Sequence, residues 1–133
     1  LKKLHIYGNG EYLRDYIYID DAVNAFLCAS VMNYEALLDR NDITLNVASG
    51  KGSSVKEVFS LISHEVEKIT GVGGVINNVA WPKEAHEIEK RNYIASIELI
   101  KSLTGWKPSV SLEEGIQLLV KHHSKESVSN EVG

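Results

Sequence analysis

The chain has 133 residues, of which 44% are hydrophobic and 24% charged, so it is long enough for one domain with a hydrophobic core and short for two. Its formal net charge of −4, without a basic cluster, argues against a nucleic-acid partner. No apolar run approaches the roughly 20 residues of a membrane span, and the single cysteine, Cys28, cannot form an internal disulfide. We therefore expect a soluble, cytoplasmic globular protein.

The regular apolar pattern ends near Ser124, and no internal repeat or low-complexity linker interrupts it. We predict one α/β domain over residues 1–124 and a flexible tail over residues 125–133. The chain begins at Leu1, without an initiator Met or a signal-peptide pattern. This start favours a fragment or an excised domain.

The stretch from Leu4 to Asp21 combines a glycine turn, a cation and two adjacent carboxylates. Within it, aromatic and β-branched residues alternate, which predicts a short strand over residues 16–19. Asp20 or Asp21 is then a suitable N-cap for the helix that follows, because a short carboxylate side chain can accept from the first free backbone N–H groups of a helix.

Arg14 lies between the turn Gly8-Asn9-Gly10 and this strand, and two interpretations of it remain open. A guanidinium beside a glycine turn can hold a phosphate or a carboxylate through two parallel hydrogen bonds. Alternatively, Arg14 pairs with Asp15 or Glu11 at the surface. The turn itself is no dinucleotide fingerprint, because it lacks the third glycine and the helix that opens behind it.

The next residues predict a helix from Asp21 to about Tyr34. Cys28 lies beside its apolar face and is interpreted as a small core residue, because no His or Lys is placed to activate the thiol. The side chains at helical spacing that form this face are Val23, Phe26, Leu27, Val31 and Tyr34.

A β-rich run at residues 43–48 predicts a strand, followed by the small-residue loop 49–52 and a second helix. This order is typical of doubly wound α/β proteins, in which ligands often bind at such loops. Ser54 and Glu57 form a capping box at the start of the second helix, and Gly71 ends its apolar stripe.

Residues 75–80 predict another strand, which leads into Trp81-Pro82. The highly charged segment 83–91 predicts a solvated loop or an exposed helical turn. Beside a binding cleft, one of the cations in this segment could reach an anionic ligand.

The remaining pattern is a very short strand at residues 93–95 and a helix over residues 97–104 with Ser96 as its cap. Gly105 ends that helix. Ser111 and Glu114 then form a second capping box, which begins the last helix.

The sequence carries no complete catalytic apparatus. Its five histidines lack the spacing of a zinc site, so structural roles for all of them are favoured. A P-loop, a nucleophile elbow and paired carboxylates are also missing. From the residues alone we predict an α/β domain with an anion site around Arg14 and the loops after Val47 and Trp81.

Several collinear stretches resemble the C-terminal part of the extended short-chain dehydrogenases/reductases, in the NAD-dependent epimerase/dehydratase group that acts on nucleotide sugars. The resemblance spans residues 4–121 and implies an α/β fold of about four helices and several short strands, with an incomplete Rossmann sheet. The similar stretches are residues 4–21 ("IYGxGxxxRDFIYVDD"), 46–50 ("NVGSG"), 54–57 ("SVxE") and 105–115 ("LGWxPxxSLEEG").

The resemblance also implies site residues. It places the nucleotide base against the backbone of His5-Ile6-Tyr7 and the sugar-nucleotide diphosphate on Arg14. The family's second diphosphate-binding arginine comes from an "RPGD"-like loop, which this sequence lacks. Three cations of the charged segment remain alternatives for that role: Lys83, Lys90 and Arg91.

The family's glycine-rich NAD(P) loop and its Tyr-x-x-x-Lys catalytic pair have no counterpart here. The resemblance therefore implies that a full-length parent enzyme binds NAD or NADP and often dimerises, whereas this chain alone holds no cofactor and is inactive. Its expected partners are a nucleotide-diphosphate sugar and an N-terminal Rossmann half. Two alternatives stay open, a non-catalytic nucleotide-sugar-binding module and an interaction domain that has lost the ligand site.

Overall fold

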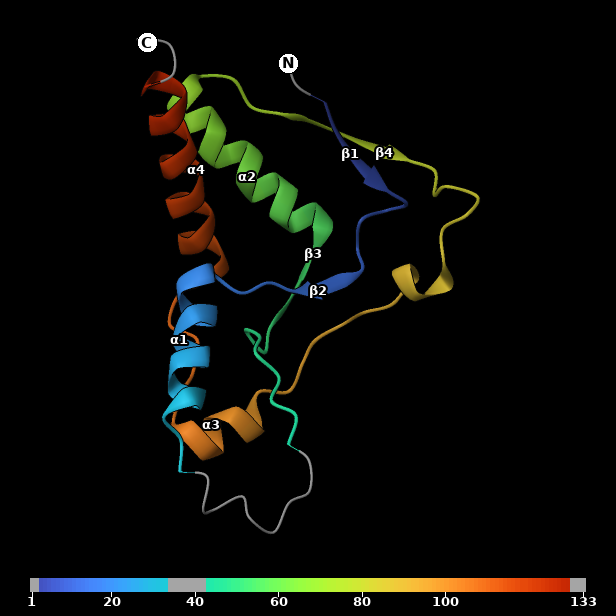
Figure 1. Ribbon diagram of the computed structural model, residues 1–133. Coiled ribbons are helices and arrows are strands. Elements are labelled where there is room, and N and C mark those ends of the chain that lie inside the picture. Colours follow the sequence, from blue (N-terminus) through green and yellow to red (C-terminus); the bar gives the residue numbers. More distant parts are fainter. Residues whose placement is uncertain (1–2, 34–42, 130–133) are drawn as a thin grey trace.

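The computed structural model describes residues 3–33 and 43–129, which form an α/β fold with two small sheets (Figure 1). In one sheet, β1 (Lys3–Tyr7) pairs in parallel with β4 (Val75–Val79). In the other, β2 (Leu13–Asp15) pairs antiparallel with β3 (Gly52–Ser54). The expected α/β class with an incomplete sheet is confirmed.

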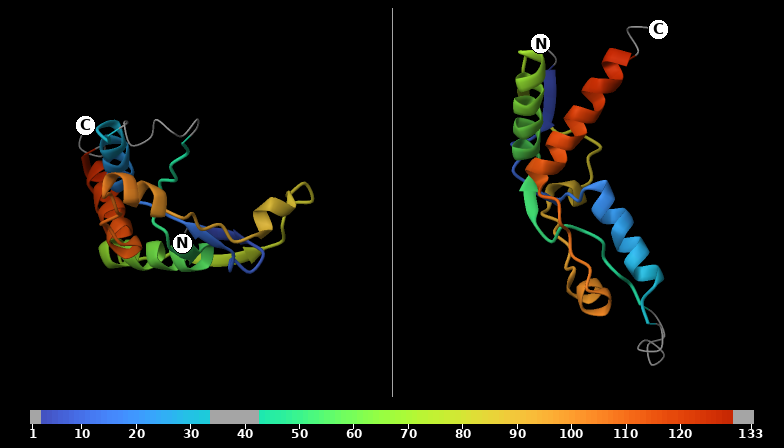
Figure 2. Two further views of the ribbon diagram at one scale, coloured as in Figure 1. Left: turned by 90° about the horizontal axis from the view of Figure 1, so that it is seen from below. Right: turned by 90° about the vertical axis from the view of Figure 1, so that its left-hand side faces the viewer.

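Four α-helices and one 3-10 helix complete the described part of the chain. Helices α2 and α4 pack against each other, and α3 packs against α1 (Figure 1). Figure 2 shows that the β1–β4 sheet extends away from α1 and α4. The helices are α1 (Ile19–Ser30), α2 (Val55–Thr70), η2 (Glu87–Lys90), α3 (Glu98–Thr104) and α4 (Leu112–Ser129). Within the described residues, none of these helices is both long and apolar enough to cross a bilayer.

The predicted strand at residues 16–19 is wrong. The strand β2 ends at Asp15, and α1 already begins at Ile19 with Tyr18 as its N-cap. Neither Asp20 nor Asp21 caps the helix, because Asp21 lies inside its first turn and is only 3% exposed. Its carboxylate accepts hydrogen bonds from the segment before α4 instead.

Two further predicted strands, residues 43–48 and 93–95, are wrong, because neither run is paired in a sheet among the described residues. The Tyr93 N–H donates to the Leu13 carbonyl at 3.0 Å, and this contact does not continue as a ladder. Runs with high β-propensity become strands only where a neighbouring strand satisfies their backbone groups. The predicted strand at residues 75–80 is confirmed as β4.

The helix boundaries follow the caps where a capping box is present. Both hydrogen bonds of the Ser54–Glu57 box form at the start of α2, and Gly71 ends the helix in the left-handed conformation. By contrast, α3 begins one residue later than predicted, and Ser96 does not cap it because Ile97 holds the N-cap position.

The last helix begins as predicted and ends later. The Ser111 hydroxyl accepts from the Glu114 N–H at 3.1 Å, and α4 continues to Ser129, past the expected end near Ser124. The predicted end of the first helix, at Tyr34, lies outside the described residues. Within the described residues, α1 ends at Ser30.

The main core lies between α1, α3 and the segment that follows α3. Ala25, Ile100 and Trp106 are buried there, and Cys28 packs against them, as expected for a small core residue. Val58 and Ile116 are buried on α2 and α4, the two helices that pack together. Helix α2 also contacts β1, β3 and β4, so the strands pack beside this second group of buried residues.

One apolar surface is left uncovered by the described residues. The predicted apolar face of α1 carries side chains with exposed fractions of 49% at Val23, 69% at Phe26 and 60% at Leu27. Exposed apolar side chains gathered on one helix face favour contact with another protein surface. We call these three residues, with Ile19, the α1 apolar face.

Candidate functional site

A cavity of about 430 Å³ opens where β1, β2 and α2 meet the segment that follows β4. It combines one cation with an unusually aromatic wall. Its lining residues are His5, Ile6, Tyr7, Gly10, Tyr12, Arg14, Tyr16, Val55, Phe59, Trp81 and Glu89.

The aromatic wall is built by the pairing of β1 with β4. Because Tyr7 lies opposite Val79 in this parallel pair, the chain delivers Trp81 next to the end of β1. The ring of Trp81 stacks on Tyr7, with the ring centres 5.5 Å apart, and meets Tyr12 edge-on at 6.4 Å. Such offset and edge-on arrangements are favourable for aromatic rings.

Gly8 is required for this close approach. It adopts φ of +65°, which disfavours a side chain, and a Cβ atom at this position would lie 2.5 Å from Nε1 of Trp81. The turn is fixed to β4 by hydrogen bonds from Gly8 N–H to the Val79 carbonyl and from Asn78 to the Gly8 carbonyl. The glycine turn thus serves the aromatic wall.

Arg14 lines the cavity from β2, and most of its donors are already used. Its Nη1 donates to the carbonyl oxygens of Leu13 at 2.9 Å and of Arg91 at 2.5 Å. Its Nη2 donates to the Glu89 carbonyl at 2.7 Å. A guanidinium has five N–H donors, so two of them, the Nε N–H and one Nη2 N–H, make no hydrogen bond to the described residues.

The ion pair of Arg14 is formed with Glu89, not with Asp15 or Glu11 as one interpretation of the sequence expected. The distance from Nη2 to the Glu89 carboxylate is 3.8 Å, and the Glu89 side chain is 58% exposed. Exposed pairs of this kind contribute little to stability. The Glu89 carboxylate is therefore a weak competitor for any anion that approaches Arg14.

Asp15 is unavailable to Arg14 because it holds the loop after Val47. Its carboxylate accepts from the N–H groups of Ser49 at 2.7 Å, Gly50 at 3.0 Å and Ala95 at 3.2 Å. The loop after Val47, which the sequence predicted as part of the anion site, thus directs its Ser49 and Gly50 N–H groups at a carboxylate of the same chain. Of the two loops predicted to belong to the anion site, only the segment after Trp81 lines the same cavity as Arg14.

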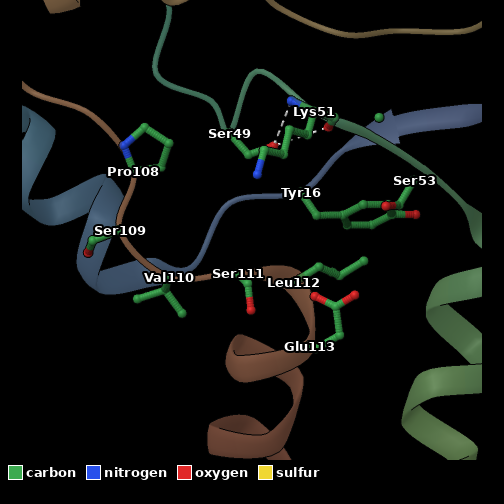
Figure 3. A pocket seen from close by; sticks show the side chains of 11 residues that line it. Tyr16, Ser49, Lys51, Ser53, Pro108, Ser109, Val110, Ser111, Leu112 and Glu113 are labelled. Atoms are coloured by element: carbon green, nitrogen blue, oxygen red, sulfur yellow. Dashed lines mark hydrogen bonds between the residues drawn. The ribbon is translucent and has the colours of Figure 1, made fainter.

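A second cavity of about 390 Å³ is also lined by Tyr16 and has a more polar lining (Figure 3). The loop with Ser49 and Lys51 borders it, and the segment from Pro108 to Glu113 runs along another side (Figure 3). Burial raises the pKa of Tyr16, and the positive charge of Arg14 opposes this shift only in part. The phenol therefore stays neutral at physiological pH and acts as a wall shared by both cavities.

The residues proposed from the family resemblance do not all meet. His5, Ile6, Tyr7 and Arg14 line the same cavity, with Ile6 only 2% exposed. Arg91 lines a smaller adjoining cavity of about 210 Å³ together with Arg14 and Glu89. Two other cations lie apart: Lys90 pairs with Glu87 at 2.7 Å, and Lys83 sits in an exposed turn.

The lining residues that reasoning from sequence did not assign to the site include Tyr12, Phe59, Trp81 and Glu89. Phe59 belonged to the recognised stripe of α2, and Trp81 directly follows a predicted strand, so its position at a strand end was a usable signal. Nothing local marked Glu89 among the neighbouring charges. No group of three or more His, Cys, Asp or Glu side chains suited to a metal ion occurs in the part of the chain that the structure describes.

Comparison with known proteins identifies the family. A family model described as GDP-mannose 4,6 dehydratase matches residues 1–119. The chain belongs to this family. The putative UDP-glucose 4-epimerase of Methanocaldococcus jannaschii is 34% identical over 86% of the chain, and the dTDP-4-dehydro-6-deoxyglucose reductase of Escherichia coli is 30% identical over 89%. The expected membership of the extended short-chain dehydrogenase/reductase epimerases and dehydratases is confirmed.

Solved structures support the same assignment of the fold. A UDP-glucose 4-epimerase of Thermotoga maritima, solved with UDP-glucose, matches with a TM-score of 0.72 and 34% identity over 93% of the chain. MoeE5, in complex with UDP-glucuronic acid and NAD, matches with a TM-score of 0.68 and 25% identity over 92% of the chain. The matches cover 35% and 37% of those two chains, and 32% and 33% of the two curated relatives. The present chain thus spans about a third of the length of its relatives.

Proposed function

We propose that this chain is the nucleotide-sugar-binding part of an NAD(P)-dependent epimerase or dehydratase, and that it carries out no hydride transfer alone. The observation that carries the proposal is the cavity in which an aromatic wall and the Arg14 guanidinium face one space. A nucleotide sugar presents the complementary groups, an aromatic base and a diphosphate. The relatives' names and the UDP-sugars in the two solved complexes agree with this ligand class.

In this proposal the diphosphate binds to Arg14. The Nε N–H and the remaining Nη2 N–H can donate to two oxygens of one ligand, while the bonds from Nη1 and Nη2 to Leu13, Arg91 and Glu89 hold the guanidinium in place. Hydrogen bonds between two charged groups are the stronger class. An anchored guanidinium also loses little conformational entropy when the ligand arrives.

The base would lie along His5-Ile6-Tyr7. Because β1 pairs only with β4 among the described residues, alternate N–H and C=O groups along its outer edge can bind a ligand. For the second phosphate, Arg91 is favoured over Lys83, since Arg91 lines the adjoining cavity with Arg14 and Lys83 does not.

The cofactor and the catalytic base would come from a further part of the polypeptide. This chain lacks a Tyr-x-x-x-Lys pair. In the full-length protein, NAD or NADP would accept a hydride from the sugar and return it.

The α1 apolar face supports the presence of a further part of the polypeptide, because its exposed Phe26 and Leu27 need a cover. We propose that the N-terminal Rossmann half of the parent enzyme covers it; a second copy of this chain is the alternative.

The test is calorimetric titration of the 133-residue chain with UDP-glucose and, in parallel, GDP-mannose and dTDP-glucose. We expect at least one to bind, and Arg14→Lys to weaken it by about tenfold or more, because an ammonium cannot form the forked pair. Lys101→Ala, on the distant helix α3, is the matched control and should bind as the wild type does.

Two results would count against the proposal. If the wild-type chain binds none of the three nucleotide sugars, the result favours the alternative of an interaction domain that has lost the ligand site. If Arg14→Lys binds as tightly as the wild type, the diphosphate lies elsewhere. Because Arg14 also holds the carbonyls of Glu89 and Arg91, thermal unfolding of each variant must accompany the titration.

A further inference from the structure

We propose that Trp81 is the base-stacking residue of the site, so that the cavity selects ligands that carry an aromatic base over sugar phosphates and pyrophosphate. This inference rests on the proposed function and adds a residue to it. The family resemblance pointed only to the backbone of His5-Ile6-Tyr7 and to cations, and it assigned nothing to Trp81.

The position of Trp81 is set by three independent contacts. Its ring stacks on Tyr7 with an angle of 29° between the planes, and it meets Tyr12 at 65°. On its third side the ring lies against Gly8, whose missing Cβ leaves the room for Nε1. The indole is therefore held in one orientation before any ligand binds, and stacking on a pre-ordered ring costs little conformational entropy.

The indole is partly buried and still borders the open cavity. Tyr7, which it stacks upon, is 49% exposed, so the pair presents an aromatic surface at the cavity wall and is not sealed in a core. By contrast, the other tryptophan, Trp106, is only 3% exposed and packs between Ala25 and Ile100. The two tryptophans thus separate into one structural ring and one ring that a ligand can reach.

The charges of the cavity define which aromatic ligand fits. Arg14 and Glu89 line the same space as Trp81, and Glu89 occupies the vicinity of the guanidinium with a weak ion pair. A neutral aromatic molecule would leave that pair intact, whereas an anion that also stacks can replace it. A nucleoside diphosphate has both groups, and the stacking and the ionic contact then reinforce each other.

The simplest structural alternative is that Trp81 only covers the glycine turn. Under that alternative, removal of the indole would weaken the binding of every ligand equally, because it would loosen the turn that precedes Arg14. Base stacking makes a different prediction, because only ligands with a base would respond to the substitution.

The experiment compares two ligands and three variants of the 133-residue chain. UDP carries a base and pyrophosphate does not. We expect Trp81→Ala to lower the affinity for UDP by about tenfold, while the affinity for pyrophosphate changes by less than about twofold. Trp81→Phe should retain most of the UDP affinity, whereas Trp81→Leu, an apolar side chain without a π-face, should lose it as Trp81→Ala does.

Tryptophan fluorescence gives a second readout. UDP should quench the emission of the wild type, and it should leave the emission of Trp81→Phe, which then comes from buried Trp106 alone, nearly unchanged. If Trp81→Ala proves unfolded, the pair Trp81→Phe and Trp81→Leu decides the question, since both fill the space beside Gly8.

The outcomes distinguish this inference from the proposed function. Equal losses for UDP and pyrophosphate, or a Trp81→Leu variant that binds UDP normally, would overturn the stacking role while binding through Arg14 stands. If the wild-type chain binds neither UDP nor pyrophosphate, the proposed function and this inference both fail.

Discussion

Helices α1 and α2 carry similar amphipathic patterns but lie in opposite environments. On α2 the apolar stripe packs toward α4 and the strands, and Val58 is 7% exposed. On α1 the equivalent stripe faces away from the described residues, and Val23 is 49% exposed. An apolar pattern therefore predicts which face of a helix seeks a partner, without telling whether the same stretch of chain supplies it.

The two helices also differ in how they are attached. The N-terminus of α2 is closed by its own capping box of Ser54 and Glu57. The N-terminus of α1 has no side-chain cap, and its acidic residue Asp21 instead binds Ser109 and Val110. Helix α1 is thus held by the polar contacts of Asp21 and by the buried side chain of Ala25. Helix α2 is held by its apolar side.

The largest effect should come from Asp21→Ala. Its carboxylate accepts from the N–H groups of Ser109 at 3.0 Å and Val110 at 2.9 Å and from the Ser109 hydroxyl at 2.8 Å. Removing it leaves these donors unpaired, so we expect a loss of about 2 to 4 kcal/mol in the free energy of unfolding, measured with urea. Asp20→Ala, at the exposed neighbouring position, should lose less than about 1 kcal/mol.

The same carboxylate gives a pH dependence. Burial opposes ionisation of Asp21, but the hydrogen bonds from Val110 and Ser109 outweigh it and lower its pKa. Because the folded pKa lies below the unfolded value, the stabilisation is present above the unfolded pKa and is lost as the pH falls through the folded one. We expect Asp21→Asn to reduce the acid sensitivity of the melting temperature below about pH 4; an unchanged acid profile would contradict this role.

A matched pair of substitutions tests the comparison directly. Val58→Ala on α2 should cost about 1 to 2 kcal/mol, because buried methyl groups are removed. Val23→Ala on α1 should stay within about 0.5 kcal/mol of the wild type. Both exchange valine for alanine inside a helix, so the difference in helix propensity is common to them and only the burial differs. Equal losses would show that the α1 apolar face is covered in this chain.

The next smaller effect belongs to the capping box. Ser54→Ala removes the acceptor for the Glu57 N–H, 3.1 Å from the Ser54 hydroxyl, and should cost about 1 kcal/mol. Ser54→Asp keeps an acceptor and should restore most of the loss in chemical denaturation. If Ser54→Asp is as unstable as Ser54→Ala, the hydroxyl stabilises the chain through another contact.

Sequence patterns predicted the helices better than the strands. The caps and stripe of α2 lie within one continuous stretch, so Ser54, Val58 and Gly71 could be recognised locally. A strand depends on its partner: β1 was overlooked because its partner β4 follows far along the chain, and residues 43–48 have no partner among the described residues. Asp21 was mistaken for a cap because its true acceptor role depends on Ser109, on a distant segment.

The candidate site also combines residues that could be predicted from the sequence with residues that could not. His5, Tyr7 and Arg14 are close in sequence and line one cavity, and their binding roles stay predictions. Trp81 and Glu89 reach the cavity only through the parallel pairing of β1 with β4 and the hydrogen bonds that Arg14 makes to the segment after it. Contacts of that range leave no periodic signal in a single sequence.

The smallest effect on stability, and the sharpest test of the comparison, is Phe26→Ser on α1. The Phe26 ring is 69% exposed, so its loss should change the free energy of unfolding of this chain by less than about 0.5 kcal/mol. The same substitution should lower binding of an apolar dye and reduce concentration-dependent self-association in sedimentation, because an exposed apolar face associates nonspecifically. In a polypeptide that also contains the proposed Rossmann half, Phe26→Ser should instead destabilise by about 2 kcal/mol or more, since the ring would then be buried. If the ring is equally dispensable in both, something other than the α1 apolar face joins the two parts.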